Sequence, residues 1–251
     1  MVDLHCHILS GIDDGAKELQ DSIAMLRAEV AQGIRSVVFT PHFNLEKLSV
    51  EDFSALRNEN LKLLQNSEEF KELNVTIKTG AEVYYSPMLY SADLEQLCIQ
   101  DTDYILIELP VASKPYEMNN VIHSIINRGY TPILAHVERY PYFTENPVLL
   151  YNLVLEGCLA QVNAGAIIGK GNQSVMAMKY LKWELAQIVC SDCHSIDRRP
   201  PNIDKALDVI NKKLGSDYID WLDKNSSDIF NNRSVDLPVI QKPKKVFGFW
   251  K

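Results

Sequence analysis

The sequence predicts an α/β fold, a closed or nearly closed barrel of parallel strands joined by helices. Three observations lead to this fold class. Strand-like apolar runs alternate with amphipathic helical stretches, the alternation repeats seven times within 251 residues, and the ionisable side chains follow the strands. Because parallel strands are joined by right-handed crossovers, seven such units in one domain favour a barrel with its polar rim at the C-terminal ends of the strands.

The first half of the chain contains four predicted strands. The first alternates Val2 and Leu4 with polar neighbours and leads into His5. The others are the β-rich runs Ile34–Thr40, Val75–Ala81 and Tyr104–Ile107. The helix after the first strand ends at Gly33, and its apolar face is Leu19, Ile23, Leu26 and Val30.

A second helix is predicted to begin at Ser49, because Ser49 and Asp52 have the spacing of a helix cap, and to reach about Phe70. A short third helix is expected near residues 91–97. In the second half, helices are predicted at 119–128, 147–156 and 174–184. The strands there are Thr131–Ala135, Leu159–Val162 and Gln187–Cys190, and from Pro200 onward only helical patterns follow, without an eighth strand.

Composition favours one domain over residues 1–251, with a basic, aromatic tail from about residue 238. A net charge of −8 disfavours nucleic acid as a partner, because binding to phosphate backbones needs a basic face. We find neither an apolar run long enough to span a bilayer nor a basic and then apolar leader, and therefore expect a cytoplasmic protein. The five cysteines are odd in number and scattered, which favours reduced thiols.

The candidate site begins with His5 and His7, whose i, i+2 spacing on an extended segment lets both imidazoles reach one ion. The other candidates also lie at or just beyond strand ends: Asp14, His42, Glu82, Glu108, His136, Asp192 and His194. Any one of them could be an ordinary loop residue on a barrel rim. Nine clustered ionisable groups without a metal would carry a heavy desolvation cost, so the set predicts two or three divalent ions, with Mn²⁺, Fe²⁺ and Zn²⁺ all compatible.

These residues belong to an ordered series of motifs: H-x-H, G-I-D-D-G, T-P-H, G-A-E, I-E-L, A-H-V-E-R-Y, and S-D-C-H with D-R-R-P-P. From Met1 to about Pro201 the series resembles the polymerase and histidinol phosphatase (PHP) superfamily, and more closely its bacterial capsule-type tyrosine-protein phosphatases. The resemblance implies a distorted (β/α)₇ barrel with a trinuclear site, with Mn²⁺ the favoured ion.

By this resemblance one ion is held by His5, His7, Glu82 and Asp192, a second by Glu82, Glu108 and His136, and a third by Asp14, His42 and His194. Asp13 beside Asp14 leaves that last assignment open by one residue. Arg139 and Arg199 match the phosphate-contacting arginines of the family, with surface pairing to Glu138 or Asp197 as the alternative.

The resemblance implies hydrolysis of phosphotyrosine on the tyrosine-rich tail of a bacterial kinase that controls capsule or exopolysaccharide synthesis. The alternatives are a histidinol-phosphate or other small-molecule phosphatase, and a non-catalytic regulator that docks on the kinase. Cys193 to Arg199 also spells C-x₅-R, the phosphate loop of cysteine-dependent phosphatases, but bulky residues and Pro200 disfavour that reading.

Two further motifs leave alternatives open. Cys190 and Cys193 form C-x-x-C without a second pair, so buried or loop cysteines are favoured over a zinc or redox site. The tail from Lys242 to Lys251 combines four lysines with three aromatic residues, which suits contact with a membrane surface or a partner, and equally an ordinary C-terminus.

Overall fold

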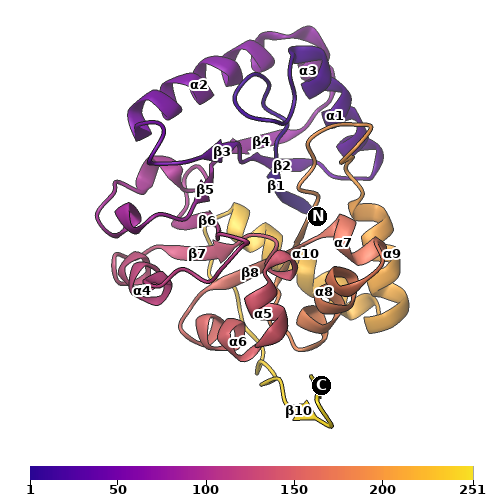
Figure 1. The fold of residues 1–251 in the computed structure, drawn as a ribbon. Helices are drawn as coiled ribbons and strands as arrows, with labels where there is room; N and C mark the ends of the chain where they lie inside the picture. Colours follow the sequence, from indigo (N-terminus) through magenta and orange to yellow (C-terminus); the bar gives the residue numbers. More distant parts are fainter. Residues whose placement is uncertain (251) are drawn as a thin grey trace.

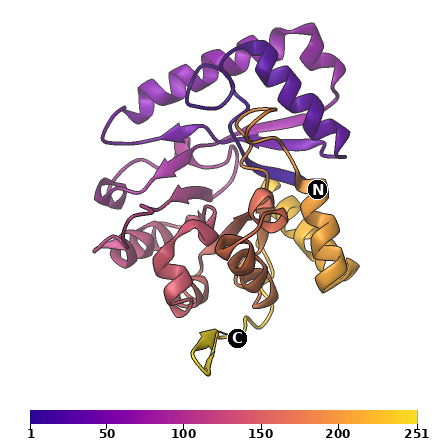
Figure 2. The same ribbon diagram turned by 45° about the vertical axis from the view of Figure 1, so that its right-hand side comes forward.

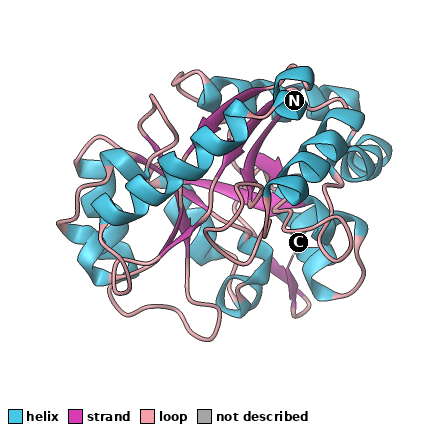
Figure 3. Ribbon diagram, turned by 90° about the horizontal axis from the view of Figure 1, so that it is seen from above, coloured by secondary structure: helices cyan, strands magenta, loops and turns pink. Residues whose placement is uncertain are grey.

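The computed structural model describes residues 1–250, and its centre is a curled parallel sheet (Figure 3). One part has the order β1 (Val2–Cys6), β2 (Ser36–Phe39) and β4 (Thr76–Thr79). The other part has the order β3 (His42–Phe43), β5 (Glu82–Tyr84), β6 (Tyr104–Glu108), β7 (Thr131–Leu134), β8 (Leu159–Asn163) and β9 (Ile188–Cys190). The predicted α/β barrel-like fold is thereby confirmed.

Two short strands, β3 and β5, follow the predicted strands at 34–40 and 75–81 and were not predicted from the sequence. Pro41, which has no amide hydrogen for the ladder, separates β2 from β3 as expected, and Gly80 lies between β4 and β5. The Gly80 amide donates to Phe39 O at 2.8 Å, and the Glu82 amide donates to Pro41 O at 3.0 Å. These bonds carry the parallel pairing past the breaks and set β3 and β5 side by side, with His42 opposite Glu82.

The two edges of the curled sheet meet at the C-terminal ends of β1 and β9. Cys6 and Cys193 form an isolated parallel bridge. The His7 amide donates to Cys193 O and the Asp192 amide donates to His5 O, each at 2.9 Å. This contact joins the first and last segments of the barrel directly below the candidate site.

Helices cover the outside of the sheet (Figure 1). Their bounds are α1 Leu19–Ala31, α2 Val50–Asn66, α3 Glu68–Glu72, α4 Met118–Asn127, α5 Pro141–Glu145, α6 Val148–Leu155, α7 Ala164–Ile168, α8 Asn172–Lys182, α9 Ile203–Leu214 and α10 Ser216–Phe230. Ser49 caps α2 as predicted, accepting from the Asp52 amide at 3.0 Å. The expected single helix to Phe70 is wrong, because Ser67 ends α2 and its hydroxyl caps α3.

The expected helix at 91–97 is also wrong. Two 3₁₀ turns, η1 (Pro87–Tyr90) and η2 (Glu95–Leu97), occupy this region, and a third, η3 (Val137–Arg139), follows β7. Segments this short form a single 3₁₀ turn rather than an α-helix, because the free-energy cost of starting an α-helix exceeds the gain from the few hydrogen bonds that it could form.

The barrel interior is apolar at one end and polar at the other. Alternate strand residues such as Leu4 and Leu106 form an inner cluster with Ile229 and Phe230 of α10, which lies at the N-terminal ends of the strands. The intervening strand residues, such as Ile105, pack against the outer helices. With α10 at one end, the interior reaches the surface at the C-terminal ends, where the ionisable residues lie.

The C-terminal tail forms a feature that the sequence did not predict. β10 (Lys245–Val246) and β11 (Phe249–Trp250) pair as an antiparallel hairpin, visible at the bottom of Figure 2. Trp250 Nε1 donates to Glu145 O at 3.1 Å, and Lys179 Nζ donates to Trp250 O at 2.9 Å. The hairpin is thus docked on α5 and α8. Within residues 1–250, the structure contains no helix with the length and apolarity that crossing a membrane requires.

Candidate metal centre

All nine predicted ligand residues meet at the C-terminal rim of the barrel. Contacts of 3.9 Å or less link their side chains into one cluster: His5, His7, Asp14, His42, Glu82, Glu108, His136, Asp192 and His194. They come from the ends of β1, β3, β5, β6, β7 and β9 and from the loop after β1. The parallel direction of the strands is what brings residues so distant in sequence to one place.

Unusual backbone conformations aim several of these side chains. His136 and Asp192 have φ angles of 33° and 51°, a left-handed region that costs an L-residue energy. At Gly15, a Cβ atom would lie 2.1 Å from the carbonyl oxygen of His7, so the loop approaches His7 more closely than any larger residue allows. Strain and close approach at these positions fit a site whose geometry is fixed by function.

The imidazoles of His5 and His7 face each other at a distance that suits a shared metal ion. His5 Nδ1 lies 3.2 Å from Gln161 Oε1, and His7 Nδ1 lies 2.6 Å from Asp13 Oδ2. Because both partners accept, each Nδ1 carries the hydrogen, and two Nε2 atoms are left 3.2 Å apart. A proton on one ring can bridge these nitrogens, whereas protonating both rings would oppose two positive charges. A metal ion that takes both lone pairs fits the same geometry.

Glu82 lies at the centre of the cluster and is 1% exposed. Its Oε2 is 3.4 Å from His5, 3.2 Å from His7 and 2.8 Å from His42, while its Oε1 is 2.8 Å from His136. Burial acts to raise the pKa of Glu82, but the surrounding imidazoles outweigh burial and hold the pKa well below its usual value. An ionised carboxylate reaching four imidazoles can be shared between ions.

His194 and Asp14 form the outer part of the cluster with His42. His194 Nδ1 lies 3.1 Å from Asp192 O, which directs its Nε2 toward Asp14 Oδ1 at 3.4 Å. This buried Nε2 makes no hydrogen bond with any of the described residues. Burial, with His7 and Arg199 nearby, lowers the pKa of His194 to about 4, so the ring is neutral and can donate its lone pair to a metal.

Asp13 and Asp14 have different surroundings. Asp13 Oδ2 accepts from His7 Nδ1 and, at 2.9 Å, from the His42 amide, while its Oδ1 accepts from the Gly15 amide at 2.9 Å. Asp14 is 68% exposed and has one oxygen 3.5 Å from His42 Nε2. The geometry therefore favours Asp14 as the ligand and Asp13 as the group that orients His7.

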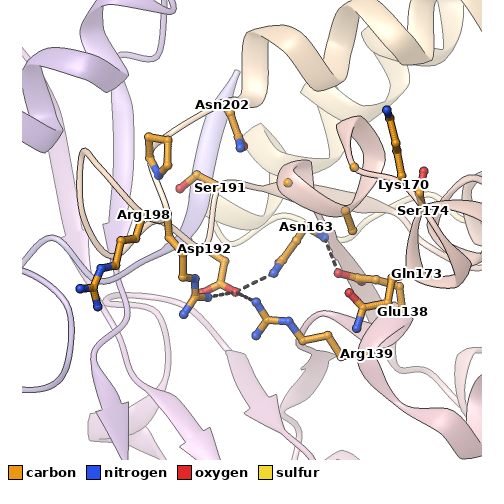
Figure 4. A pocket seen from close by; sticks show the side chains of 15 residues that line it. Glu138, Arg139, Asn163, Lys170, Gln173, Ser174, Ser191, Asp192, Arg198 and Asn202 are labelled. Carbon is orange, nitrogen blue, oxygen red and sulfur yellow. Dashed lines mark hydrogen bonds and ion pairs between the residues drawn. The ribbon is translucent and has the colours of Figure 1, made fainter.

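Arg139 and Arg199 both contact Asp192. Their Nη2 atoms lie 2.7 Å and 2.5 Å from Asp192 Oδ2, which Asn163 Nδ2 also contacts at 2.6 Å (Figure 4). Asp192 Oδ1 lies 3.5 Å from Nε2 of both His5 and His7. Within residues 1–250 no ion pair joins either arginine to Glu138 or Asp197, so the surface pairing considered from the sequence does not form.

Two polar residues behind the cluster, Gln161 and Asn163, were not identified as site residues from the sequence. Gln161 Oε1 contacts His5 Nδ1 and accepts from the His136 amide at 2.7 Å, while Gln161 Nε2 donates to Asn163 at 2.7 Å. The available signal was their i, i+2 spacing within the apolar strand β8, which places both on one face. Gln161 fixes the tautomer of His5, and Asn163 holds Asp192 through its side-chain amide.

Cys193 points away from the cluster into the apolar core, with its Sγ 3.8 Å from Glu29 Oε1. It is fully buried, whereas Arg199 contacts Asp192 on the metal side. The C-x₅-R segment therefore does not form a loop around phosphate. Within residues 1–250 all five cysteines are free and buried, as expected for reduced thiols.

Three overlapping groups in the cluster each place ligand atoms within 4.8 Å of one another, which suits divalent metal ions. They are His5, His7 and Asp192; His42, Glu82 and Glu108; and His7, Asp14, His42 and His194. The third matches the triad implied by the resemblance, with His7 added. His136 contacts Glu82 and Glu108 but belongs to none of the three groups.

Comparison with known proteins gives consistent matches. The family model for capsular polysaccharide synthesis, CpsB/CapC, matches residues 1–231. Tyrosine-protein phosphatase YwqE from Bacillus subtilis (strain 168) is 34% identical over 257 residues, covering 100% of both chains. Tyrosine-protein phosphatase CpsB from Streptococcus pneumoniae is 30% identical, covering 86% of this chain and 92% of its own.

A solved structure extends this likeness to three dimensions. It comes from crystal structures of YwqE from Bacillus subtilis and CpsB from Streptococcus pneumoniae, described as unique metal-dependent tyrosine phosphatases. It superposes with a TM-score of 0.86 at 30% identity and covers 97% of this chain and 100% of that chain. Sequence and fold thus agree over nearly the whole chain.

Proposed function

The chain belongs to the CpsB/CapC family of capsular polysaccharide synthesis, and from this membership we propose that it is a metal-dependent tyrosine-protein phosphatase. The observation that carries the proposal is the pair of Nε2 atoms of His5 and His7, 3.2 Å apart beside the ionised Glu82. Burying these groups together costs free energy when no cation is bound. When a metal ion is present, the same groups are its ligands.

We propose two or three divalent ions, with Mn²⁺ favoured and Fe²⁺ or Zn²⁺ as alternatives, because the ligands mix imidazoles and carboxylates. The ligands would be His5, His7, Asp14, His42, Glu82, Glu108, His136, Asp192 and His194. The donor set fits such ions, since a buried His194 nitrogen among the described residues has no hydrogen-bond partner. Divalent ions held here would supply positive charge and Lewis acidity opposite the oxygens of a phosphate monoester.

The residues around the ligands would bind and orient the substrate. Arg139 and Arg199 approach the cluster from the loops after β7 and β9, and their side chains are 31% and 37% exposed. Each guanidinium has further N–H groups beyond its contact with Asp192, and its planar fork matches phosphate oxygens. We assign them to holding the phosphate, while Asp13 and Gln161 fix the imidazole orientations.

The proposed substrate is the phosphorylated tyrosine-rich tail of a bacterial tyrosine kinase that acts in capsule or exopolysaccharide synthesis. Its support is the family's role in capsular polysaccharide synthesis and the identity of the relatives YwqE and CpsB as tyrosine-protein phosphatases. A cytoplasmic place of action belongs to the same proposal, since such a kinase uses cytoplasmic ATP. Contact of the tail with a membrane is not part of it, because Trp250 docks on the protein body.

A substrate panel tests this proposal. The metal-loaded protein is given phosphotyrosine peptides, histidinol phosphate and p-nitrophenyl phosphate, and released phosphate is measured. We expect the highest kcat/KM for the phosphotyrosine peptides. A higher value for histidinol phosphate would indicate a small-molecule phosphatase, and no release from any substrate by protein with full metal content would indicate a non-catalytic regulator.

A further inference from the structure

A hollow of about 600 Å³ borders the metal centre on the side of His42 and Glu108. It is also lined by the apolar side chains of Ile12, Phe43 and Leu48 and the ring of Tyr84, together with the polar Asp13, Asn44 and Lys47. A cavity that combines apolar and aromatic walls with a few polar groups is the usual form of a site for a small organic group.

Two other hollows border the cluster and are different in kind. One lies beside Asp192 and is lined by polar and charged side chains that include Lys170, Gln173 and Arg198 (Figure 4). The other lies beside Asp14 and His194 and mixes charged groups such as Lys17 and Asp21 with the apolar Met25 and Ile196. Neither of these two hollows is lined by a Phe or Tyr ring, whereas the hollow beside His42 is lined by Phe43 and Tyr84.

The walls of this hollow are held in place by local structure. Phe43 follows His42 in β3 and is 2% exposed, and Tyr84 ends β5 opposite Glu108 of β6. The loop that carries Leu48 is a hydrogen-bonded turn, because the Leu48 amide donates to Asn44 O at 3.1 Å. Ser86 Oγ donates to Glu46 Oε1 at 3.1 Å and ties the same loop to the chain beyond β5.

Leu48 and Tyr84 are each 37% exposed. Each therefore has accessible surface facing a cavity that already contains the proposed ligands His42 and Glu108. Burying this apolar surface against an aromatic ring is favourable. Contact between that ring and the ring of Tyr84 adds further binding free energy.

We propose that this hollow is the subsite for the aromatic ring of an aryl phosphate, with Tyr84 and Leu48 determining the preference for aryl over alkyl phosphates. The inference rests on the proposed function, because the phosphate must lie at the metal centre for its ring to enter here. The ring of phosphotyrosine is bonded to the phosphate through one oxygen, so it must occupy a space next to the cluster, and of the three hollows this one is lined by aromatic rings, those of Phe43 and Tyr84.

Binding of two phosphonates to the metal-loaded protein tests the subsite without depending on turnover. Phenylphosphonate carries a ring and methylphosphonate does not, and both are titrated calorimetrically into wild type, Tyr84→Ala, Leu48→Ala and Tyr84→Phe. We expect the Kd of phenylphosphonate to rise about 10-fold in Tyr84→Ala, which corresponds to about 1.4 kcal/mol. The Kd of methylphosphonate should change less than about twofold, since no ring contact is lost.

The matched control is Tyr116→Ala, which removes a fully exposed tyrosine outside the hollow and should leave both Kd values unchanged. Tyr84→Phe keeps the ring and should behave as wild type, while Leu48→Ala gives a second, smaller truncation of the same wall. Metal content and melting temperature of each variant show whether it is folded.

The outcomes separate this inference from the proposed function. Equal weakening of both phosphonates in Tyr84→Ala, no weakening, or no preference of wild type for phenylphosphonate overturns the aryl subsite and leaves the phosphatase proposal intact. Selective weakening of phenylphosphonate in a protein that releases no phosphate from phosphotyrosine peptides supports the subsite and overturns the proposed activity.

Discussion

The carboxylate of Asp13 lies 2.6 Å from Nδ1 of His7 and so determines which nitrogen of that ring faces the metal centre. With the hydrogen on Nδ1, the Nε2 lone pair points at His5 and Glu82. Burial acts to raise the pKa of Asp13, but the bond to His7 outweighs it and lowers the pKa, so Asp13 is ionised. The adjacent Asp14 lies instead against the outer imidazoles.

We therefore expect Asp13→Asn to weaken metal binding by about 10- to 100-fold, because a neutral amide accepts from His7 Nδ1 more weakly than the carboxylate and no longer raises the basicity of the ring. Asp14→Asn should affect mainly the ion nearest His42 and His194. Bound metal per chain, measured across a chelator series, distinguishes the two variants. If Asp13→Asn kept wild-type affinity while Asp14→Asn lost all the ions, the orienting role of Asp13 would be wrong.

Removing the metal should abolish phosphatase activity and lower the melting temperature. Without the metal, the buried nitrogens of His5 and His7 and the carboxylate of Glu82 lose the cation that balances them. A ligand that binds only the folded state stabilises it by about 4 kcal/mol when its free concentration is 1,000 times its Kd. Adding Mn²⁺ back should restore both properties. Undiminished turnover in protein shown to be metal-free by elemental analysis would contradict the metal-dependent mechanism.

Arg139→Ala and Arg199→Ala should each lower kcat/KM by about 10- to 1,000-fold, the scale of a charged hydrogen bond lost at an electrophilic centre. Metal content should be unchanged, since neither arginine is a ligand. Inhibition by inorganic phosphate provides a second measurement, and its Ki should rise in both variants. Lys170→Ala, which removes a cation that makes no contact with Asp192 from the hollow that both arginines line, is the matched control. Wild-type kinetics in both arginine variants would leave them as partners of Asp192 alone.

Cys193→Ser should retain activity to within about tenfold, whereas loss of a true nucleophile costs several orders of magnitude. The sulfur is buried beside Glu29 and faces away from the cluster. Because the smaller hydroxyl leaves space in a closely packed, fully buried position, a modest drop in melting temperature is expected. Activity per bound metal is the quantity to compare, and its collapse in a folded variant would revive the cysteine-dependent mechanism.

Gly15→Ala should reduce both stability and metal affinity. The added Cβ would lie 2.1 Å from His7 O, so the loop that carries Asp13 and Asp14 must move away from β1. Gly165→Ala is a suitable control, because its Cβ would meet the nearest side-chain atom at 3.6 Å. Equal melting temperatures and metal contents for the two variants would show that the loop tolerates the displacement.

The sequence by itself determined the fold class and the composition of the centre. Seven apolar runs alternate with helices, and the residues that end them, such as His42, Glu82 and His136, must share one rim because parallel strands all point the same way. Hydrophobic period is a local property, and a helix between successive strands implies that they run parallel, so both can be inferred without knowing the contacts. The same holds for the Ser49 cap and for Gly33, which has the positive φ of 85° that its position after α1 requires.

Only the tertiary structure decided the contacts between segments distant in sequence. It placed Asp14 rather than Asp13 against His194. It also brought Gln161 into contact with His5, from which it is separated by 156 positions in the sequence. It also added the short strands β3 and β5 after Pro41 and Gly80 and docked Trp250 on the body. Each of these depends on which side chain faces which partner. That choice is made by the free energy of packing and hydrogen bonding across the whole barrel, and no local pattern encodes it.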